Sequence, residues 1–286
     1  MGLSSLKSKL GLESKQDEFS DPPPNYTEAT GSPSGSPPSF AASTSTGFNP
    51  TTQLQVQAIG YDMNQALTGK TLENITAYRA DTGDAEYVSM RLKKNSNSCA
   101  LVRAADPAQT PLISTIYRIG PGRGPKMRIL SAEGGLTVDK AIEDHENTRG
   151  ELIDVKSRSM ISRAQVLDTS LGKFEWRYGD RKERDAYNAD NILIMERVDQ
   201  ATLPNGSKSE RGARVAQLVR NSEFRTPGTH KNMGGNGGRL MVDLSMWQVE
   251  KGTVAQDVEA FVVASAILML KREADRFIDN NIAAVV

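Results

Sequence analysis

The stretch AFVVASAILML, Ala260–Leu270, decides which folds this 286-residue chain can adopt. It is a run of small and apolar residues that only Ser265 interrupts, and a serine can hydrogen-bond back to its own helix. The run lies inside a helical pattern from Val254 to about Asn280. As a helix the run is about 16 Å long, which is too short for a bilayer that needs roughly twenty residues. A helix that is apolar on every side must therefore be buried in protein.

The large apolar residues of this run point in several directions around the helix, so we expect all of them to be buried. They are Val262, Val263, Ile267, Leu268 and Leu270. A charged segment follows at once, from Lys271 to Arg276, and we expect it to mark the point where the helix leaves the core for water.

Upstream of the helix, from Leu54, short runs rich in β-branched and aromatic residues alternate with turn residues. About twelve such runs can be counted. In the run EYVSMRLK, Glu86–Lys93, the residues alternate with period two, which predicts one dry and one wet face. Its alternation sets Val88, Met90 and Leu92, as the dry face, against Tyr87, Ser89, Arg91 and Lys93.

Many antiparallel strands followed by one helix that needs cover on all sides favour a mainly β fold. We expect a closed antiparallel barrel of about twelve strands around the buried C-terminal helix, because such a barrel covers the helix and removes the sheet edges.

The chain resembles the tubby C-terminal-like superfamily, which includes tubby, the phospholipid scramblases and the plant LURP-one-related proteins, and it is most similar in character to a filamentous-fungal branch. The resemblance lies in the strand succession, in GKFEWRYGD (Gly172–Asp180) followed by NILIMERV (Asn191–Val198), and in the final helix Glu259–Phe277. It implies a barrel around a central helix. The phosphoinositide-binding basic residues of tubby and the calcium-binding and cysteine-rich segments of scramblases cannot be placed here, so no binding residue is carried over.

Residues 1–50 are rich in Pro, Ser, Thr and Gly and predict a disordered tail before a barrel domain at 51–286. The tail contains a Pro-Pro-x-Tyr motif, formed by Pro23, Pro24 and Tyr26. Such a motif docks into WW domains in a preformed polyproline II conformation. We expect a WW-domain partner, and analogy suggests a ubiquitin ligase of the HECT class. A chance match in a Pro-rich segment is the alternative.

The 35 basic and 35 acidic residues balance, which argues against a nucleic-acid partner. The region from Asn205 to Arg239 nevertheless has an excess of positive charge. Its candidate patch for anionic lipid headgroups or phosphorylated partners consists of Lys208, Arg211, Arg214 and Arg220. An ordinary solvated loop is the simpler interpretation. The sequence GGNGGR, Gly234–Arg239, lacks the features of a phosphate loop and is interpreted as a hairpin loop or a mobile insertion.

No motif predicts a catalytic residue, a metal ligand or a cofactor. The EDHE segment at Glu143–Glu146 is best interpreted as a solvated turn, and Cys99, the only cysteine, as a small core residue. We therefore expect a non-enzymatic adaptor protein of the cytoplasm with a WW-binding tail. The alternatives are a peripheral membrane protein that binds or moves anionic phospholipid, and an enzyme whose site is invisible in the sequence.

Overall fold

The computed structural model describes residues 48–62, 74–93, 96–117, 124–131, 135–159, 162–198, 212–247 and 253–283. The predicted tail with Pro23, Pro24 and Tyr26 lies outside the described residues, and so do Lys208 and Arg211. Where the tail ends and the folded domain begins therefore stays a prediction.

Thirteen antiparallel strands form a single sheet in the order β7-β6-β5-β4-β3-β2-β1-β13-β12-β11-β10-β9-β8. Because β1 pairs with β13, the first and last strands of the chain lie side by side in the middle of that order. The strands are β1 (Thr52–Gln57), β2 (Ile75–Arg79), β3 (Ala85–Arg91), β4 (Cys99–Arg103), β5 (Pro111–Ile116), β6 (Lys126–Leu130), β7 (Gly150–Asp154), β8 (Lys156–Ser157), β9 (Gln165–Thr169), β10 (Gly172–Tyr178), β11 (Asn191–Arg197), β12 (Ala213–Arg220) and β13 (Gly238–Val242).

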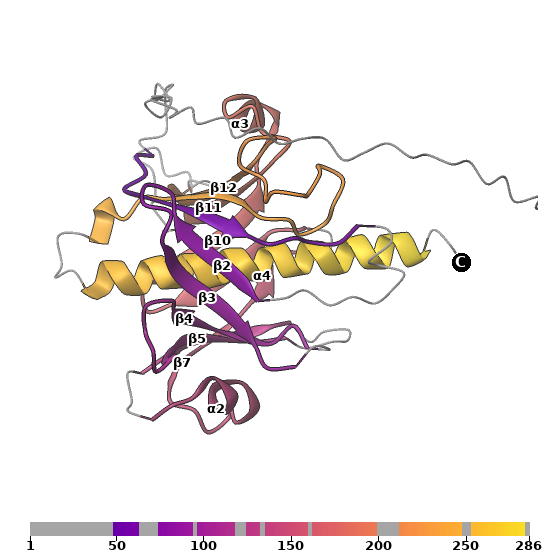
Figure 1. Ribbon diagram of the computed structural model, residues 1–286. Coiled ribbons are helices and arrows are strands. Elements are labelled where there is room, and N and C mark those ends of the chain that lie inside the picture. Colours follow the sequence, from indigo (N-terminus) through magenta and orange to yellow (C-terminus); the bar gives the residue numbers. More distant parts are fainter. Residues whose placement is uncertain are drawn as a thin grey trace, which may run out of the picture. The chain divides into compact units, whose positions relative to one another are not determined.

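The sheet curls into a nearly closed barrel around the C-terminal helix (Figure 1). Its seam lies between β7 and β9, which are neighbours without a backbone ladder between them. The carboxylate of Glu151 bridges the seam, because it accepts hydrogen bonds from the backbone N–H of Ser170 at 2.6 Å and from its hydroxyl at 2.5 Å. The stretch Gly150–Ser157 is divided at Val155 into β7 and β8, and the sheet has thirteen strands where about twelve were expected.

Helix α4, Thr253–Ala283, passes through the barrel (Figure 1). The predicted fold class is confirmed: a mainly β barrel surrounds an apolar C-terminal helix. Val262, Val263, Ile267, Leu268 and Leu270 are each at most 2 % exposed and belong to one core cluster with the inward side chains of the strands. Burial of these side chains stabilises the barrel around the helix, since the hydrophobic effect scales with the apolar area removed from water.

The charged residues after Leu270 do not mark the exit of the helix into water, and that expectation is wrong. Lys271 is 1 % exposed, and its ammonium donates a hydrogen bond of 2.9 Å to the carbonyl of Asn97. The other charged residues of this segment are partly buried, and the barrel wall supplies partners for some of them. Asp275, for example, accepts hydrogen bonds from the hydroxyl of Tyr117 and from Nδ2 of Asn97.

The two faces of β3 are the reverse of the prediction. Tyr87 and Ser89 are buried, whereas Val88 and Met90 are only partly buried. The period of two is right, but the hydroxyl of Tyr87 donates a hydrogen bond of 2.9 Å to Glu259 of α4. A polar group with a partner inside the barrel outweighs the apolar character of its neighbours.

A second layer covers the outside of β11–β13. Helix α3, Arg181–Asp185, begins at a capping box formed by Asp180 and Glu183, and the segments beside it are held by a small apolar cluster. The cluster consists of Ile192, Ile194, Val219, Phe224 and Met241. Helix α2 (Val138–Glu143) lies at the opposite end of the view in Figure 1, and a short 3-10 turn, η3 (Ser245–Trp247), precedes α4.

This architecture, a nearly closed antiparallel barrel with one helix inside, is compatible with a tubby-like fold. In the part of the chain that the structure describes, none of the helices combines the length and the apolar character needed to span a bilayer.

Candidate functional site

A cavity of about 750 Å³ opens beside the second half of α4. Four parts of the chain contribute lining residues: residue 158 with 162–164, and residues within 175–191, 220–236 and 273–280. They come from the segment before β9, the end of β10 with α3, the loop after β12, and α4 itself. The volume falls in the range of about 300–1,000 Å³ that is usual for small-ligand sites.

The lining of this cavity is rich in positive charge. Its basic residues are Arg158, Arg163, Arg177, Arg184, Arg220, Arg225, Lys231 and Arg276. Its acidic residues are Glu175, Asp190 and Glu273. A concave site with one dominant sign of charge focuses its field and concentrates ions of the opposite sign.

The floor of the cavity is an ion pair between β12 and α4. Both terminal nitrogens of Arg220 donate to the carboxylate of Glu273, which also accepts from the hydroxyl of Tyr178 at 3.1 Å and from the backbone N–H of Gly235 at 3.2 Å. Burial alone would raise the pKa of Glu273, but the charge and hydrogen bonds of Arg220 hold that pKa below its usual value. Burial, followed by the negative charge of Glu273, raises the pKa of Tyr178 to about 12. Tyr178 is therefore a neutral donor, and the floor carries no net charge.

The glycines of GGNGGR allow this floor to form. At Gly234 a side chain would place its Cβ 2.4 Å from the Cβ of Phe277, and at Gly235 the φ of +77° also disfavours other residues. The segment lies at the end of the loop that joins the paired antiparallel strands β12 and β13, as the hairpin-loop interpretation predicts, and its last two residues begin β13. It is a loop whose backbone lies against α4, and Gly234 exchanges two backbone hydrogen bonds with Tyr61. The glycines of GGNGGR were the signal for this arrangement in the sequence, because residues without a side chain let the backbone approach another element closely.

The rim of the cavity holds the more exposed charges. Arg225 pairs with Asp190, and Arg158 pairs with Glu175 at 3.2 Å. The guanidinium of Arg163 lies 5.9 Å from the centre of the Tyr178 ring. Lys231 and Arg276 form no ion pair with any residue that the structure describes.

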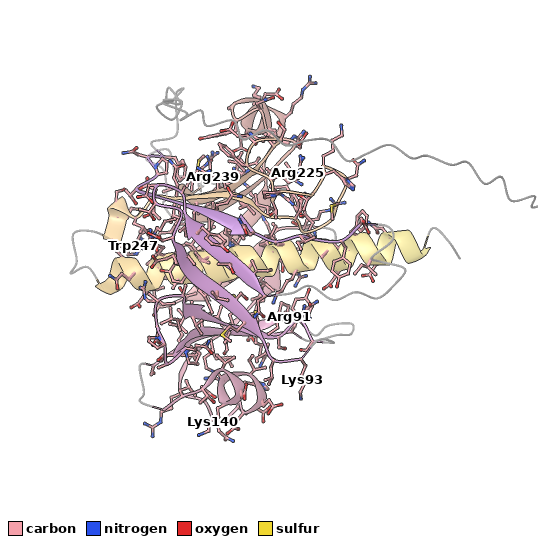
Figure 2. The ribbon with its side chains drawn as sticks, viewed as in Figure 1. Arg91, Lys93, Lys140, Arg225, Arg239 and Trp247 are labelled. Carbon is pink, nitrogen blue, oxygen red and sulfur yellow. The ribbon has the colours of Figure 1, made fainter. Side chains whose placement is uncertain are left out.

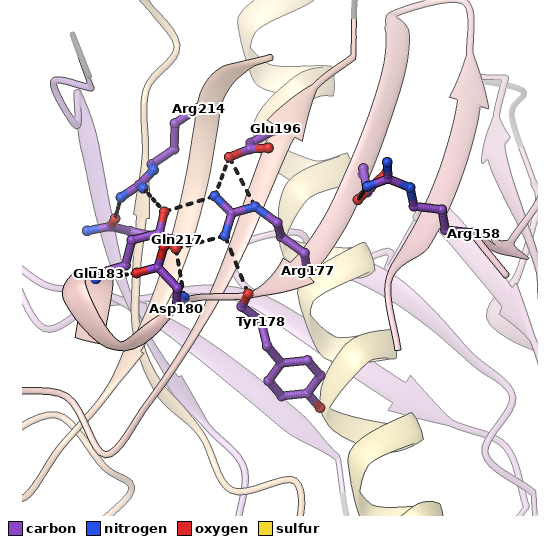
Figure 3. Close-up of polar contacts among 9 residues, drawn as sticks. Arg158, Arg177, Tyr178, Asp180, Glu183, Glu196, Arg214 and Gln217 are labelled. Carbon is purple, nitrogen blue, oxygen red and sulfur yellow. Dashed lines mark hydrogen bonds and ion pairs between the residues drawn. The ribbon is translucent and has the colours of Figure 1, made fainter. Parts of the chain in front are cut away.

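One wall of the cavity is held by a network of charges on the outer face of the sheet (Figure 3). Arg177 of β10 donates to both oxygens of Glu183, each at 2.8 Å, and also pairs with Glu196 of β11. Arg214 of β12 reaches the same Glu183 at 2.6 Å and Gln217 at 2.8 Å. Burial would raise the pKa of Glu183, but the hydrogen bonds from Arg177 and from the N–H of Asp180 hold it at about 2. This network fixes α3, and with it the side chain of Arg184, beside the cavity.

The structure separates the residues of the predicted anion patch. Arg220 lies on the floor of the cavity, paired with Glu273, whereas Arg214 lies in the outer network and is paired with Glu183. Neither guanidinium is free for an external ligand, so the patch as predicted stays a prediction that depends on Lys208 and Arg211, outside the described residues. The cavity instead gathers arginines from distant parts of the chain, and of these Arg158 and Arg276 had no signal in the sequence as a binding group.

Metal-binding clusters and the single cysteine are the other reactive groups to consider. Among the described residues no group of His, Cys, Asp and Glu side chains could hold a metal ion. Cys99 is buried at the start of β4. Burial would raise the pKa of its thiol, but the ammonium of Lys271 and hydrogen bonds from neighbouring side chains lower it.

Comparison of the chain with protein-family models, with curated proteins and with solved structures finds no significant match. Its function therefore has to be inferred from the residues of the cavity and from the sequence.

Proposed function

We propose that this chain is a non-enzymatic interaction protein whose tubby-like barrel binds a phosphate-bearing anion in the cavity beside α4. The excess of basic over acidic side chains in the cavity lining supports the proposal most directly. Arginine and lysine side chains are the usual protein partners of phosphate oxygens, and hydrogen bonds between charged groups are about twice as strong as those between neutral ones.

Some charged residues of the cavity are paired within the protein, and others are not. Glu273 already neutralises Arg220, and Glu183 and Glu196 neutralise Arg177, so these buried pairs shape the cavity. Lys231 and Arg276 have no such partner in the described part of the chain. We propose that they supply the net attraction for the anion, assisted by Arg163 at the rim.

The ligand can be a lipid headgroup or a soluble phosphate compound, because both present the same oxygens. Co-sedimentation with vesicles of phosphatidylcholine and phosphatidylserine, against phosphatidylcholine alone, tests the first source. Titration with inorganic phosphate tests the second. Binding to the mixed vesicles without binding of inorganic phosphate would assign the cavity to lipid, whereas phosphate binding without vesicle binding would assign it to a soluble ligand.

A pair of charge-neutralising variants gives a matched comparison. Lys231→Gln/Arg276→Gln removes two cavity cations, while Lys93→Gln/Lys140→Gln removes two exposed lysines outside the cavity lining. Figure 2 shows both of these lysines on the other side of α4 from the cavity residue Arg225. The first should weaken binding about tenfold or more, since each charged hydrogen bond contributes on the order of 1.5–3 kcal/mol. Equal loss in both double variants would show that only the total charge matters and would refute the cavity.

The tail completes the proposed adaptor. Pro23, Pro24 and Tyr26 supply a ligand for a WW domain, and a HECT-type ubiquitin ligase is the proposed kind of partner. The proposal is that the barrel binds an anionic ligand while the tail recruits a second protein.

A further inference from the structure

We propose that the carboxylate of Asp190 pairs with Arg225 where an anionic group of the ligand would bind. Asp190 then competes with the ligand for this arginine. This inference rests on the anion-binding function proposed above and concerns the regulation of that same site. It predicts that the affinity of the cavity for phosphate is set by how readily Asp190 gives up its arginine.

The exposure of the ion pairs in the cavity singles out this one. The Asp190 side chain is 42 % exposed, whereas its partner Arg225 is only 11 % exposed. In the pair of Arg158 and Glu175 the relation is reversed, because the arginine side chain is 54 % exposed and the carboxylate side chain only 11 %. An external anion can therefore replace Asp190 from the solvent side without moving the arginine, which it cannot do at the other pair.

The buried pair on the floor cannot exchange in this way. The carboxylate of Glu273 accepts from Tyr178 and from the N–H of Gly235 as well as from Arg220. Removing it would leave several buried donors without an acceptor, which is costly. Asp190 has one side-chain partner among the described residues, Arg225.

Neither loop needs the Asp190–Arg225 pair to keep its shape. The backbone N–H of Asp190 donates to the carbonyl of Arg220 at 2.9 Å, and that of Arg225 donates to Asn221 at 3.1 Å. Phe224, next to Arg225, is buried in the outer apolar cluster, and the Thr226 hydroxyl accepts from the N–H of Ala58 at 3.1 Å. The backbone on both sides of Arg225 is thus held without the ion pair. A partly exposed ion pair contributes little to stability, so a phosphate can replace one partner at small cost.

The test is a gain of affinity in the full-length chain. Inorganic phosphate is titrated against the wild type, Asp190→Asn and Glu143→Gln, and binding is followed by calorimetry. Both variants change the net charge by the same amount and break an exposed ion pair, but Glu143 pairs with Lys93 at 2.9 Å and contributes nothing to the cavity lining. We expect Asp190→Asn to bind phosphate about fivefold more tightly than the wild type, and Glu143→Gln to bind as the wild type does.

Two further variants trace the gain to Arg225. Arg225→Gln should weaken phosphate binding, and Asp190→Asn/Arg225→Gln should lose the gain seen in Asp190→Asn. A gain that survives in the double variant would overturn the proposal, because the effect would then be one of net field alone. Phosphate binding by the wild type that Asp190→Asn does not strengthen would also overturn it while leaving the proposed function intact. Absence of binding in the wild type and all variants would refute the anion-binding function itself.

Discussion

The indole N–H of Trp176 donates a hydrogen bond of 3.0 Å to the hydroxyl of Ser265 inside the barrel, and so joins β10 to α4. Both side chains are buried, and the Ser265 hydroxyl donates in turn to the carbonyl of Val262 at 3.1 Å. The one polar residue that interrupts the apolar run of the helix is thus the partner of the largest fully buried side chain.

Replacing Ser265 with alanine should destabilise the barrel by about 1–3 kcal/mol, because the indole N–H of Trp176 would be buried without an acceptor. Urea denaturation followed by tryptophan fluorescence and circular dichroism measures the change. Trp176→Phe/Ser265→Ala removes both partners, so its cost should be smaller than the sum of the two single costs. Simple additivity of the two changes would contradict a coupling between these residues.

The apolar helix should behave as core. Leu268→Ala should lower the free energy of unfolding by about 2–5 kcal/mol, the range for large-to-small changes in a packed interior. Leu268→Asp should prevent folding, since an isolated charge there would have no partner. Leu152→Ala, at an exposed leucine of β7, is the matched control and should change stability by no more than about 0.5 kcal/mol. A Leu268→Asp variant that melts at the wild-type temperature would refute the buried helix.

The outer network should make stability depend on pH through Glu183. Its pKa in the folded chain is about 2, below the usual 4.5, so the unfolded chain takes up the proton first as the pH falls. The stability that the ionised carboxylate contributes is therefore complete above pH 4.5 and is lost as the pH falls towards 2. Glu183→Gln should be less stable than the wild type at neutral pH and should approach it in acid. Denaturant melts at successive pH values measure this, and parallel curves for the two proteins would contradict it.

The tail should bind a WW domain independently of the barrel. A peptide of residues 17–30 should bind with an affinity of about −7 kcal/mol or weaker, in the micromolar range that short, partly preformed ligands reach. Tyr26→Ala should abolish binding, because the aromatic anchor is lost, whereas Asn25→Ala changes the variable position of the motif and should have little effect. Fluorescence anisotropy measures both. Equal binding by the Tyr26→Ala and native peptides would make the motif a chance match.

The fold could be predicted because its two main signals are local. An apolar run too short for a bilayer requires a protein cover, and regular short strands supply it. The inward face of β3 could not be predicted, since the choice of Tyr87 over Val88 depends on Glu259, which lies far away in the sequence. The burial of Lys271 could not be predicted either, because its hydrogen-bond acceptor, the carbonyl of Asn97, also lies far away in the sequence.

The cavity was hidden for a related reason. Arg158, Arg225 and Arg276 belong to three separate parts of the chain, and of these only Arg225 lies in the region of positive charge, 205–239, that the sequence singles out. The local excess of charge in the sequence pointed to Arg214 and Arg220, but both have internal carboxylate partners. Clusters of charge along a sequence reveal which side chains are near each other in the chain, whereas a site depends on which of them remain unpaired after folding.

Backbone amide chemical shifts of the full-length chain, recorded while inorganic phosphate is added, test the anion-binding cavity most directly. The account predicts that shifts concentrate at the lining loops, including the amides of Gly179, Asn232 and Gly234, and that α2 on the far side is unaffected. Lys231→Gln/Arg276→Gln should need about tenfold more phosphate, or more, to reach the same shifts. Shifts that spread evenly over the exposed lysines and arginines, or that this variant shows at the same phosphate concentration as the wild type, would contradict a phosphate site beside α4.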